Sequence, residues 1–185
     1  MRSMFDFEDN GWDSERSDIY GRTGPLDFTD LFSSPSNPAE LFPELITELR
    51  NHLSVSRAVL VIREKTASQY LAVATVNGGR ARKNLTLRLP GQSSLFDQVA
   101  HGGIAYSENF CGLFSGNSFE RNLLIDDDSQ AFAVMPLKSD GQIVGVLGLS
   151  SETPMAFATI DDGAMDRVSD QLAACIARHY PATTA

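Results

Sequence analysis

AFAVMPLKSDGQIVGVLGLSS, residues Ala131 to Ser151, is the stretch that decides the fold of this chain. Apolar residues run almost without a break on both sides of Ser139-Asp140-Gly141-Gln142. An Asp-Gly pair between two apolar runs is a strong short-range signal for a β-hairpin. The nearly continuous apolar character indicates that both faces of the resulting sheet are covered. Gly145 and Gly148 are expected to let a neighbouring segment approach the backbone of the second strand.

A long amphipathic segment follows the hairpin. Apolar residues recur every four positions, which predicts a helix from about Ile160 to Tyr180 with one apolar face. Thr159 and Asp162 are typical of its N-terminus, because a capping side chain and early acidic residues satisfy the free N–H groups there. The apolar face is wide enough to pack on the sheet and also on a second subunit. Its residues are Ile160, Ala164, Met165, Val168, Leu172, Cys175 and Ile176.

The hairpin and the final helix together resemble a known domain family. Their motifs are Met-Pro-Leu in the first strand (135–137), Gly-Val-Leu-Gly-Leu in the second (145–149) and Phe-x-x-x-Asp-Asp before the helix (157–162). This combination resembles the GAF domain, a small cytoplasmic sensor module, loosely over residues 39–180 and most specifically over 131–178. The resemblance implies an α/β (α+β) fold of the GAF/PAS kind. Its six-stranded antiparallel sheet has the order 3-2-1-6-5-4, with helices on both faces.

The chain before the hairpin predicts the remaining elements. Asn37, Pro38 and Glu40 are typical of a helix start with a capping box. Pro43 indicates either a kink in that helix or its true start. Residues 108–128 show no regular period, and the resemblance implies that they cover a ligand pocket. The apolar patterns predict strands over 57–64, 69–77 and 81–89, a helix over 92–101 capped by Ser93 or Ser94, and a short strand over 104–107.

Composition and charge restrict the class of protein. The 185 residues carry 24 acidic and 15 basic side chains, for a net charge of −9, and no basic stripe that could follow nucleic-acid phosphates. No apolar run is long enough for a membrane helix, and the N-terminus lacks the apolar core of a signal peptide. The two cysteines form no disulfide framework, which is typical of a reducing compartment. We therefore expect a cytoplasmic protein without nucleic-acid or membrane partners.

Residues 1–38 have the composition of a tail. Gly, Ser, Asp, Asn and Pro are frequent, acidic residues outnumber arginines, and no helical or strand period persists. Aromatic residues interrupt this pattern and allow three interpretations: a solvated tail, a tail packed on its own domain, or a peptide that docks on a partner protein. Residues 26–32, which can form one or two amphipathic turns, are the best candidate for docking. We expect the domain itself over 39–181, followed by a short tail of 182–185.

A small-molecule pocket is the first functional hypothesis. The fold alone does not decide between binding and structural roles. We therefore base the prediction of a pocket on the residues between 106 and 132. Several phenylalanines and few converging polar groups there predict an apolar or aromatic ligand. The candidate pocket residues are Tyr106, Phe110, Cys111, Phe114, Phe119 and Phe132.

The alternative is a ligand-free interaction module. Such a module forms a homodimer through its terminal helices and binds a partner protein through residues 1–38. A wide pocket that contains polar groups favours the first hypothesis. Phenylalanines packed flat on the sheet, together with an exposed apolar patch on the helices, favour the second.

Thiol chemistry finds little support in the sequence. The resemblance includes GAF relatives that reduce free methionine sulfoxide with cysteines near this pocket, and Cys111 lies in a loop where a reactive thiol is expected. No histidine is placed by the sequence to act as its base, and Cys175 lies on the inner face of the final helix. Bilin-binding relatives commonly carry His after their cysteine, whereas Gly112 follows Cys111. We expect neither enzyme activity nor a cofactor.

Cyclic nucleotides and metals are disfavoured on similar grounds. Cyclic-nucleotide-binding GAF domains carry an Asn-Lys pair before Phe-x-x-x-Asp, where this chain has Ser151-Glu152-Thr153-Pro154. The three histidines show no zinc-ligand spacing. Asp126, Asp127 and Asp128 are more typical of a solvated loop than of a cation site, so we expect no bound metal.

Overall fold

The predicted hairpin is present and lies inside the sheet. Strand β6 runs over Ala131–Ser139 and strand β7 over Gln142–Ser151. Asp140 and Gly141 turn the chain with positive φ angles of 50° and 73°, as a two-residue type I′ turn requires. The computed structural model describes residues 28–33, 36–64, 69–109, 114–158 and 162–180.

One antiparallel sheet contains the described strands. Its order is β3-β2-β1-β7-β6-β5, and β4 also pairs with β2. This is the predicted order 3-2-1-6-5-4, with the third predicted strand present as two pieces, so the α+β class is confirmed. The other strands are β1 (Arg57–Glu64), β2 (Gln69–Asn77), β3 (Arg80–Arg82), β4 (Leu87–Arg88) and β5 (Tyr106–Glu108).

The prediction of one continuous strand over 81–89 is wrong. Both pieces pair with β2, but the segment between them pairs irregularly, through a bond from the N–H of Leu85 to the carbonyl oxygen of Val73 in β2 at 2.9 Å. Asn84 adopts a positive φ of 55°, a left-handed conformation that ends extended structure and that asparagine tolerates better than most residues. The burial of the segment is also irregular, because Leu87 is 41% exposed while Leu89 is 8% exposed.

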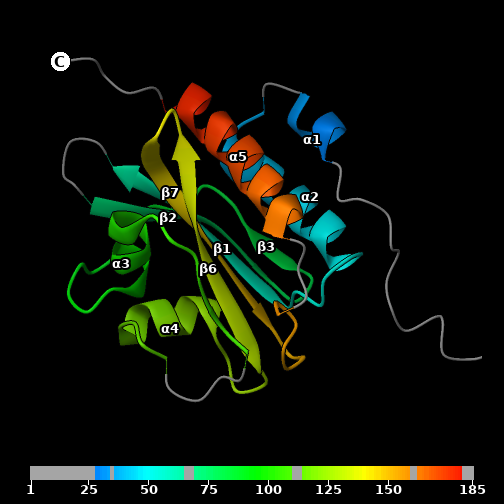
Figure 1. The fold of residues 1–185 in the computed structure, drawn as a ribbon, viewed down its shortest axis with the longest axis vertical. Coiled ribbons are helices and arrows are strands. Elements are labelled where there is room, and N and C mark those ends of the chain that lie inside the picture. Colours follow the sequence, from blue (N-terminus) through cyan, green and yellow to red (C-terminus); the bar gives the residue numbers. More distant parts are fainter. Residues whose placement is uncertain (1–27, 34–35, 65–68, 110–113, 159–161, 181–185) are drawn as a thin grey trace, which may run out of the picture.

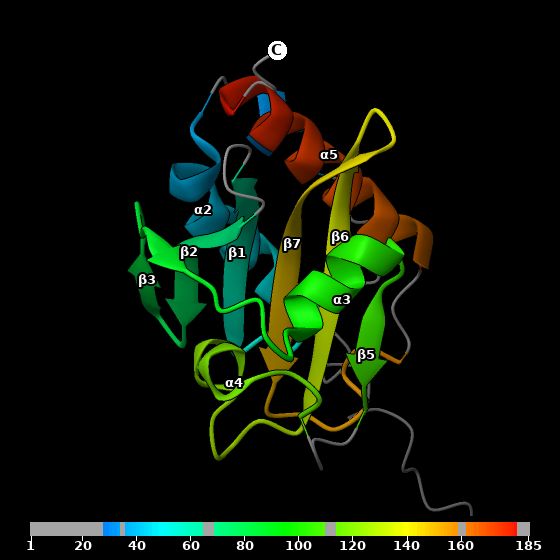
Figure 2. The same ribbon diagram turned by 90° about the vertical axis from the view of Figure 1, so that its left-hand side faces the viewer.

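Helices cover both faces of the sheet. Helices α1 (Thr29–Ser33), α2 (Pro38–Arg50) and α5 (Asp162–His179) lie on one face, and α3 (Leu95–Gly102) and α4 (Ser118–Leu124) on the other (Figure 1). Figure 2 views the second face, with α3 and α4 in front of the strands. Side chains of the hairpin alternate between the two layers. Leu147 and Leu149 belong to the core beneath α2 and α5, whereas Phe132 and Val146 belong to the core beneath α3 and α4.

The two glycines of β7 lie in close contact with their neighbours. A Cβ atom at Gly145 would collide with the carbonyl oxygen of Val61 in β1. At Gly148 a Cβ would lie 2.8 Å from Cγ1 of Val59 and 3.2 Å from Cδ1 of Leu124. The predicted close approach to this strand is therefore confirmed, since neither position has space for a side chain.

The first long helix starts upstream of its internal proline. Helix α2 begins at Pro38 and continues through Pro43. The side chain of Asn37 accepts the backbone N–H of Ala39 at 2.9 Å, as an N-cap does. Within the described structure, no bond from Glu40 back to Asn37 completes the predicted capping box.

Part of the predicted tail packs on the domain. Phe28, just before the short helix α1, and Phe32 within it are 5% and 7% exposed and join the core beneath α2 and α5. For these two aromatic residues the structure supports packing on the protein's own domain. Residues 1–27 lie outside the described residues.

Two short elements begin later than predicted. Ser93 has a positive φ of 52°, so α3 starts at Leu95 with Ser94 as its N-cap. Gly103, with a φ of 62°, ends the helix in the left-handed conformation of a glycine C-cap. Strand β5 begins at Tyr106, and Ile104 before it is 75% exposed.

The prediction of an irregular segment over 108–128 is wrong at Ser118–Leu124, which forms α4. Asn117 and Glu120 form a complete capping box at its start, in which each side chain accepts the other's backbone N–H. Reciprocal bonds of this kind satisfy two of the free N–H groups at a helix end.

Helix α5 closely follows its prediction. Its apolar residues Val168, Leu172 and Ile176 are buried on the sheet. Thr159, the predicted N-cap, lies outside the described residues. No helix in the described part of the chain is long and apolar enough to cross a membrane.

Candidate functional site

Three aromatic rings meet on the face covered by α3 and α4. Phe132 of β6 is 1% exposed. The ring centroid of Tyr106 lies 5.9 Å from that of Phe132 with the planes tilted by 30°, and the centroid of Phe114 lies 5.2 Å away with a tilt of 54°. Pairs in this distance range stabilise each other beyond simple burial. We call these three residues the aromatic cluster.

A cavity of about 190 Å³ lies beside the aromatic cluster. Phe114 and Phe132 form its apolar wall, and most of the remaining lining is polar. Pockets for drug-sized ligands usually measure about 300 to 1,000 Å³, so this cavity suits a smaller molecule. The other lining residues are Arg121, Ile125, Asp126, Asp127, Ser129 and Gln130.

The polar wall is fixed to the sheet through Asp126. Its Oδ2 lies 3.1 Å from Nε of Arg57 in β1, and its Oδ1 accepts the Ser129 hydroxyl at 2.7 Å. The Ser129 oxygen in turn accepts the backbone N–H of Asp126 at 3.1 Å. Arg57 also donates from Nη1 to the carbonyl oxygen of Ile125 at 2.9 Å. Because the bonds form a connected network, this side of the cavity is ordered before any ligand arrives.

Arg121 is the cation that lines the cavity. Among the described residues, no ion pair or side-chain hydrogen bond involves its guanidinium. The carboxylate of Asp126 is paired with Arg57. The charged side chains of the lining without such an ion pair are therefore those of Arg121 and Asp127. A ligand's acceptor group can therefore bind the five N–H donors of Arg121 without displacing a protein partner.

Glu120 joins the two helices above the cavity. Its carboxylate is fully buried and accepts the Ser94 hydroxyl, the N–H of Leu95 at 2.8 Å and the N–H of Phe96 at 3.2 Å. It also accepts the N–H of Asn117 at 3.3 Å, so one carboxylate caps both α3 and α4. A negative charge at two helix N-termini is favourable because of the helix dipoles. Through this contact α3 and α4 are held together over the sheet.

The predicted pocket residues divide into three groups. Tyr106, Phe114 and Phe132 come together in the aromatic cluster. Phe119, on α4, is 36% exposed and lines neither the cavity nor the grooves described below. Phe110 and Cys111 lie outside the described residues.

The polar residues of the cavity were not predicted from the sequence. The Asn117-Ser118-Phe119-Glu120 pattern is a capping-box signal that places α4, and Arg121 with it. Asp126 and Ser129, three residues apart, are typical of a turn closed by side-chain hydrogen bonds. No local sequence pattern indicates the role of Arg57. That role depends on the contact between β1 and the loop that contains Asp126, which is distant in sequence.

Cys175 is a core residue on the opposite face. It is 1% exposed, and its thiol donates to the carbonyl oxygen of Ser36 at 3.5 Å. Burial raises the pKa of this thiol, although the positive charge of Arg178 acts in the opposite direction. It belongs to the core beneath α2 and α5, whereas Phe132 belongs to the core across the sheet. Within the described ranges, no group of three or more His, Cys, Asp or Glu is arranged to hold a metal.

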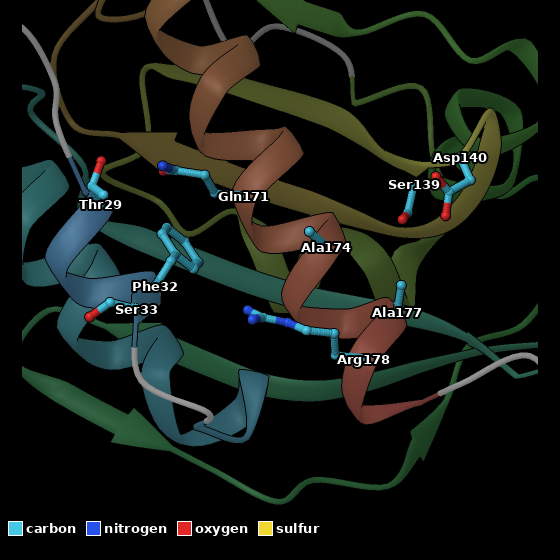
Figure 3. Close-up of a pocket in the computed structure, with 9 residues that line it drawn as sticks. All are labelled: Thr29, Phe32, Ser33, Ser139, Asp140, Gln171, Ala174, Ala177 and Arg178. Atoms are coloured by element: carbon cyan, nitrogen blue, oxygen red, sulfur yellow. The ribbon is translucent and has the colours of Figure 1, made fainter.

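Two grooves lie on the α5 side of the sheet. The smaller, of about 240 Å³, separates β5 from α5. The larger, of about 700 Å³, is an open depression between α1, α5 and the turn of the hairpin. Figure 3 shows Gln171 and Arg178 extending from α5 toward α1, where Phe32 lies. The lining of the larger groove is Thr29, Phe32, Ser33, Ser139, Asp140, Gln171, Ala174, Ala177 and Arg178.

Comparison with known proteins decides the family. A model of the GAF domain family matches residues 37–176. The chain belongs to the GAF domain family. GAF domains are regulatory and sensor modules. The strand order and the two helical layers of this chain agree with its membership of the family. No curated protein sequence matches this GAF domain significantly.

Solved structures share the fold at low sequence identity. One is the GAF domain of a phosphoenolpyruvate-protein phosphotransferase from Coxiella burnetii, with a TM-score of 0.66 and 19% identity over 83% of this chain and 90% of that chain. Another is the GAF domain of a two-component sensor histidine kinase from Bacillus halodurans, with a TM-score of 0.61 and 15% identity over 84% and 97% of the two chains.

An enzyme is also among the similar structures. Free methionine-R-sulfoxide reductase from Neisseria meningitidis, in complex with its substrate, has a TM-score of 0.62 and 15% identity over 83% of this chain and 86% of that chain. At such identities the likeness shows the fold alone. The same fold therefore serves regulatory domains and enzymes, and the site must decide between them.

Proposed function

We propose that this GAF domain is a non-catalytic sensor module of bacterial-type cytoplasmic signalling that binds a small molecule in the cavity beside Phe114 and Phe132. One observation carries the proposal: an aromatic wall and an ordered polar wall meet at a cavity of about 190 Å³. Small-molecule sites orient their ligands through a few precisely placed polar groups, and here such groups make up most of the lining. The sensor kinase and phosphotransferase GAF domains of the same fold support the signalling context.

The lining indicates the chemistry of the ligand. A flat apolar part would pack on Phe114 and Phe132, in keeping with the predicted aromatic ligand. The exposed guanidinium of Arg121 adds a requirement for an acceptor group such as a carboxylate, because Arg binds planar acceptors in a forked geometry. The expected ligand is therefore a small aromatic or apolar acid.

The non-catalytic part of the proposal is supported by the position of Cys175. A thiol reductase of this fold would need a second thiol near the pocket, and Cys175 is buried in the core on the other side of the sheet. A raised thiol pKa also lowers the fraction of reactive thiolate.

The alternative, an interaction module that forms a homodimer through its terminal helices, receives less support. In the described part of the chain the large apolar side chains that remain exposed are Leu87, Ile104, Phe119 and Met155. None of these lies on α2 or α5. The groove between α1 and α5 is open, and Phe32 is the one large apolar side chain among its lining residues, whereas the cores of stable interfaces are enriched in large aromatic and methionine side chains.

Native mass spectrometry of freshly purified protein, beside a denatured sample, tests the proposal. We expect a discrete mass excess in the native spectrum that disappears on denaturation. Arg121→Gln is expected to reduce the occupied fraction, whereas Arg167→Gln, a matched change at an exposed residue of α5, leaves it unchanged.

A purely apo spectrum leads to a second measurement on the same sample. A panel of small aromatic carboxylates is then added, and the melting temperature is recorded. If no compound raises the melting temperature of the wild type, the proposal is overturned. An apo mass at twice the monomer with the same negative panel would establish the interaction module instead.

A further inference from the structure

We propose that the groove between edge strand β5 and helix α5 binds an extended peptide segment of a partner protein, one that carries apolar side chains and a basic residue. The groove holds about 240 Å³ and lies on the α5 side of the sheet, apart from the small-molecule cavity. This peptide site goes beyond the proposed function, because it assigns a protein partner to a second surface.

The first observation is the free edge of the sheet. Strand β5 is the last in the strand order and pairs only with β6 among the described strands. Figure 2 shows β5 at one edge of the sheet, beside β6. The backbone of an edge strand can pair with an added peptide strand, which supplies main-chain hydrogen bonds. Ala105 and Ser107 place this edge along the groove.

The second observation is an apolar floor made of adaptable side chains. Met135 of β6, Met165 of α5 and Phe157 before α5 line the groove. Each of the three is less than one tenth exposed. Unbranched methionine side chains adjust to different apolar partners. Alternate side chains of an added strand point to the same face, so one of them would reach this floor.

The third observation is the exposed apolar surface at both ends of β5. Ile104, two residues before the strand, is 75% exposed. Met155 is 50% exposed, and its N–H donates to the carbonyl oxygen of Asn109, the residue after the strand. Two of the exposed large apolar residues in the described part of the chain therefore flank a strand of three residues. An added peptide strand along β5 would pass both side chains and could cover them.

The fourth observation concerns charge. Asp166 and Asp170, one helical turn apart on α5, line the groove, and Lys138 at the Gly103 end is the one basic residue in its lining. The excess of carboxylates favours a lysine or arginine in the occupant.

Together these features favour a peptide over a small molecule. The proposed contact surface includes Ile104 and Met155, neither of which lines the groove between β5 and α5. A compact ligand of about 240 Å³ would leave the strand edge and both exposed side chains unused. An extended segment contacts all of them at once.

Phage display of random heptapeptides on the immobilised full chain tests the proposal. We expect enriched sequences with apolar residues at alternate positions and at least one lysine or arginine. The best peptide is then synthesised with a fluorescent label, and its Kd is measured by anisotropy. Replacing its central backbone N–H groups by N-methyl groups is expected to abolish binding, because the methylated strand cannot pair with β5.

Matched variants locate the site. Asp166→Asn with Asp170→Asn should weaken binding about three- to ten-fold, the range for two partly exposed ion pairs. Glu44→Gln with Glu48→Gln, an exposed pair with the same spacing on α2, should change the Kd less than two-fold. Ala105→Trp, at an exposed position of the groove, should block binding, with circular dichroism confirming the fold.

Several outcomes would overturn the proposal. One is a selection that enriches no peptide over the unselected library. Another is an enriched peptide whose Kd is the same in the wild type, the Asp166/Asp170 variant and Ala105→Trp. Full binding by the N-methylated peptide would also exclude pairing with the strand edge.

Discussion

The hydroxyl of Ser94, the N-cap of α3, donates to the buried carboxylate of Glu120 in α4. The two residues are 26 positions apart in the sequence, and the same carboxylate accepts three backbone N–H groups from the starts of the two helices. Helix α4, which supplies Arg121 to the cavity lining, is thus fixed to α3 by one acidic side chain. The position of α4 is thereby coupled to that of α3.

Glu120→Ala is expected to destabilise the fold by about 3 to 5 kcal/mol, because four donors lose their acceptor in a buried site. Glu120→Gln should cost less, about 1 to 3 kcal/mol, since the amide retains one acceptor oxygen but turns a donor toward other donors. Urea unfolding measures both. Glu44→Gln on the exposed side of α2 is the control and should stay within about 0.5 kcal/mol. Equal stability of Glu120→Ala and the wild type would contradict the role of this carboxylate.

Gly145→Ala should destabilise the sheet by about 1 to 3 kcal/mol, the usual cost of overpacking. The reason is that the new Cβ would collide with the carbonyl oxygen of Val61, a backbone atom that cannot move without disturbing β1. Gly91→Ala is the matched control, because nothing lies within 4 Å of a Cβ at that position. Thermal unfolding of both variants gives the comparison, and a similar melting temperature for the two would refute the close approach.

The hairpin shows why much of this fold could be predicted from local sequence. The Asp-Gly turn specifies a left-handed conformation that few other residues adopt, and the glycines of β7 lie where no side chain fits, so both signals survive in the final structure. Leu87 and Asn84 show the opposite case. An alternating pattern predicted one strand there, but a single left-handed asparagine ended it, and a period of two does not reveal such a break.

The site was harder to predict than the fold for a physical reason. Phe114 and Phe132 are apolar, and apolar residues in a compact domain pack together in the core, so their proximity could be predicted. Arg57 and Asp126 meet only because β1 and the loop after α4 are brought together by the sheet. Polar contacts over such sequence distances depend on the tertiary structure, and no local pattern records them.

The contact between Phe114 and Phe132 should contribute about 0.5 to 1.5 kcal/mol beyond the burial of the two rings. A double-mutant cycle with Phe114→Leu and Phe132→Leu measures this coupling, because leucine keeps each position apolar. Phe114→Leu combined with Met135→Leu, a core residue on the other face of the sheet, is the control and should show no coupling. Additive effects of the two phenylalanine changes would mean that the rings do not interact specifically.

Cys175 is expected to be unreactive in the folded protein. Burial to 1% exposure blocks access to its thiol, and the raised thiol pKa lowers the thiolate fraction at any given pH, so the reaction should stay slow even at pH 8. Labelling of a Cys111→Ser variant with Ellman's reagent isolates this one thiol. We expect negligible reaction in buffer and complete reaction after addition of guanidinium chloride. Rapid labelling of the native variant would show that the thiol is accessible. Turnover of free methionine sulfoxide by the wild type, with dithiothreitol as reductant, would replace the non-catalytic proposal by an enzymatic one.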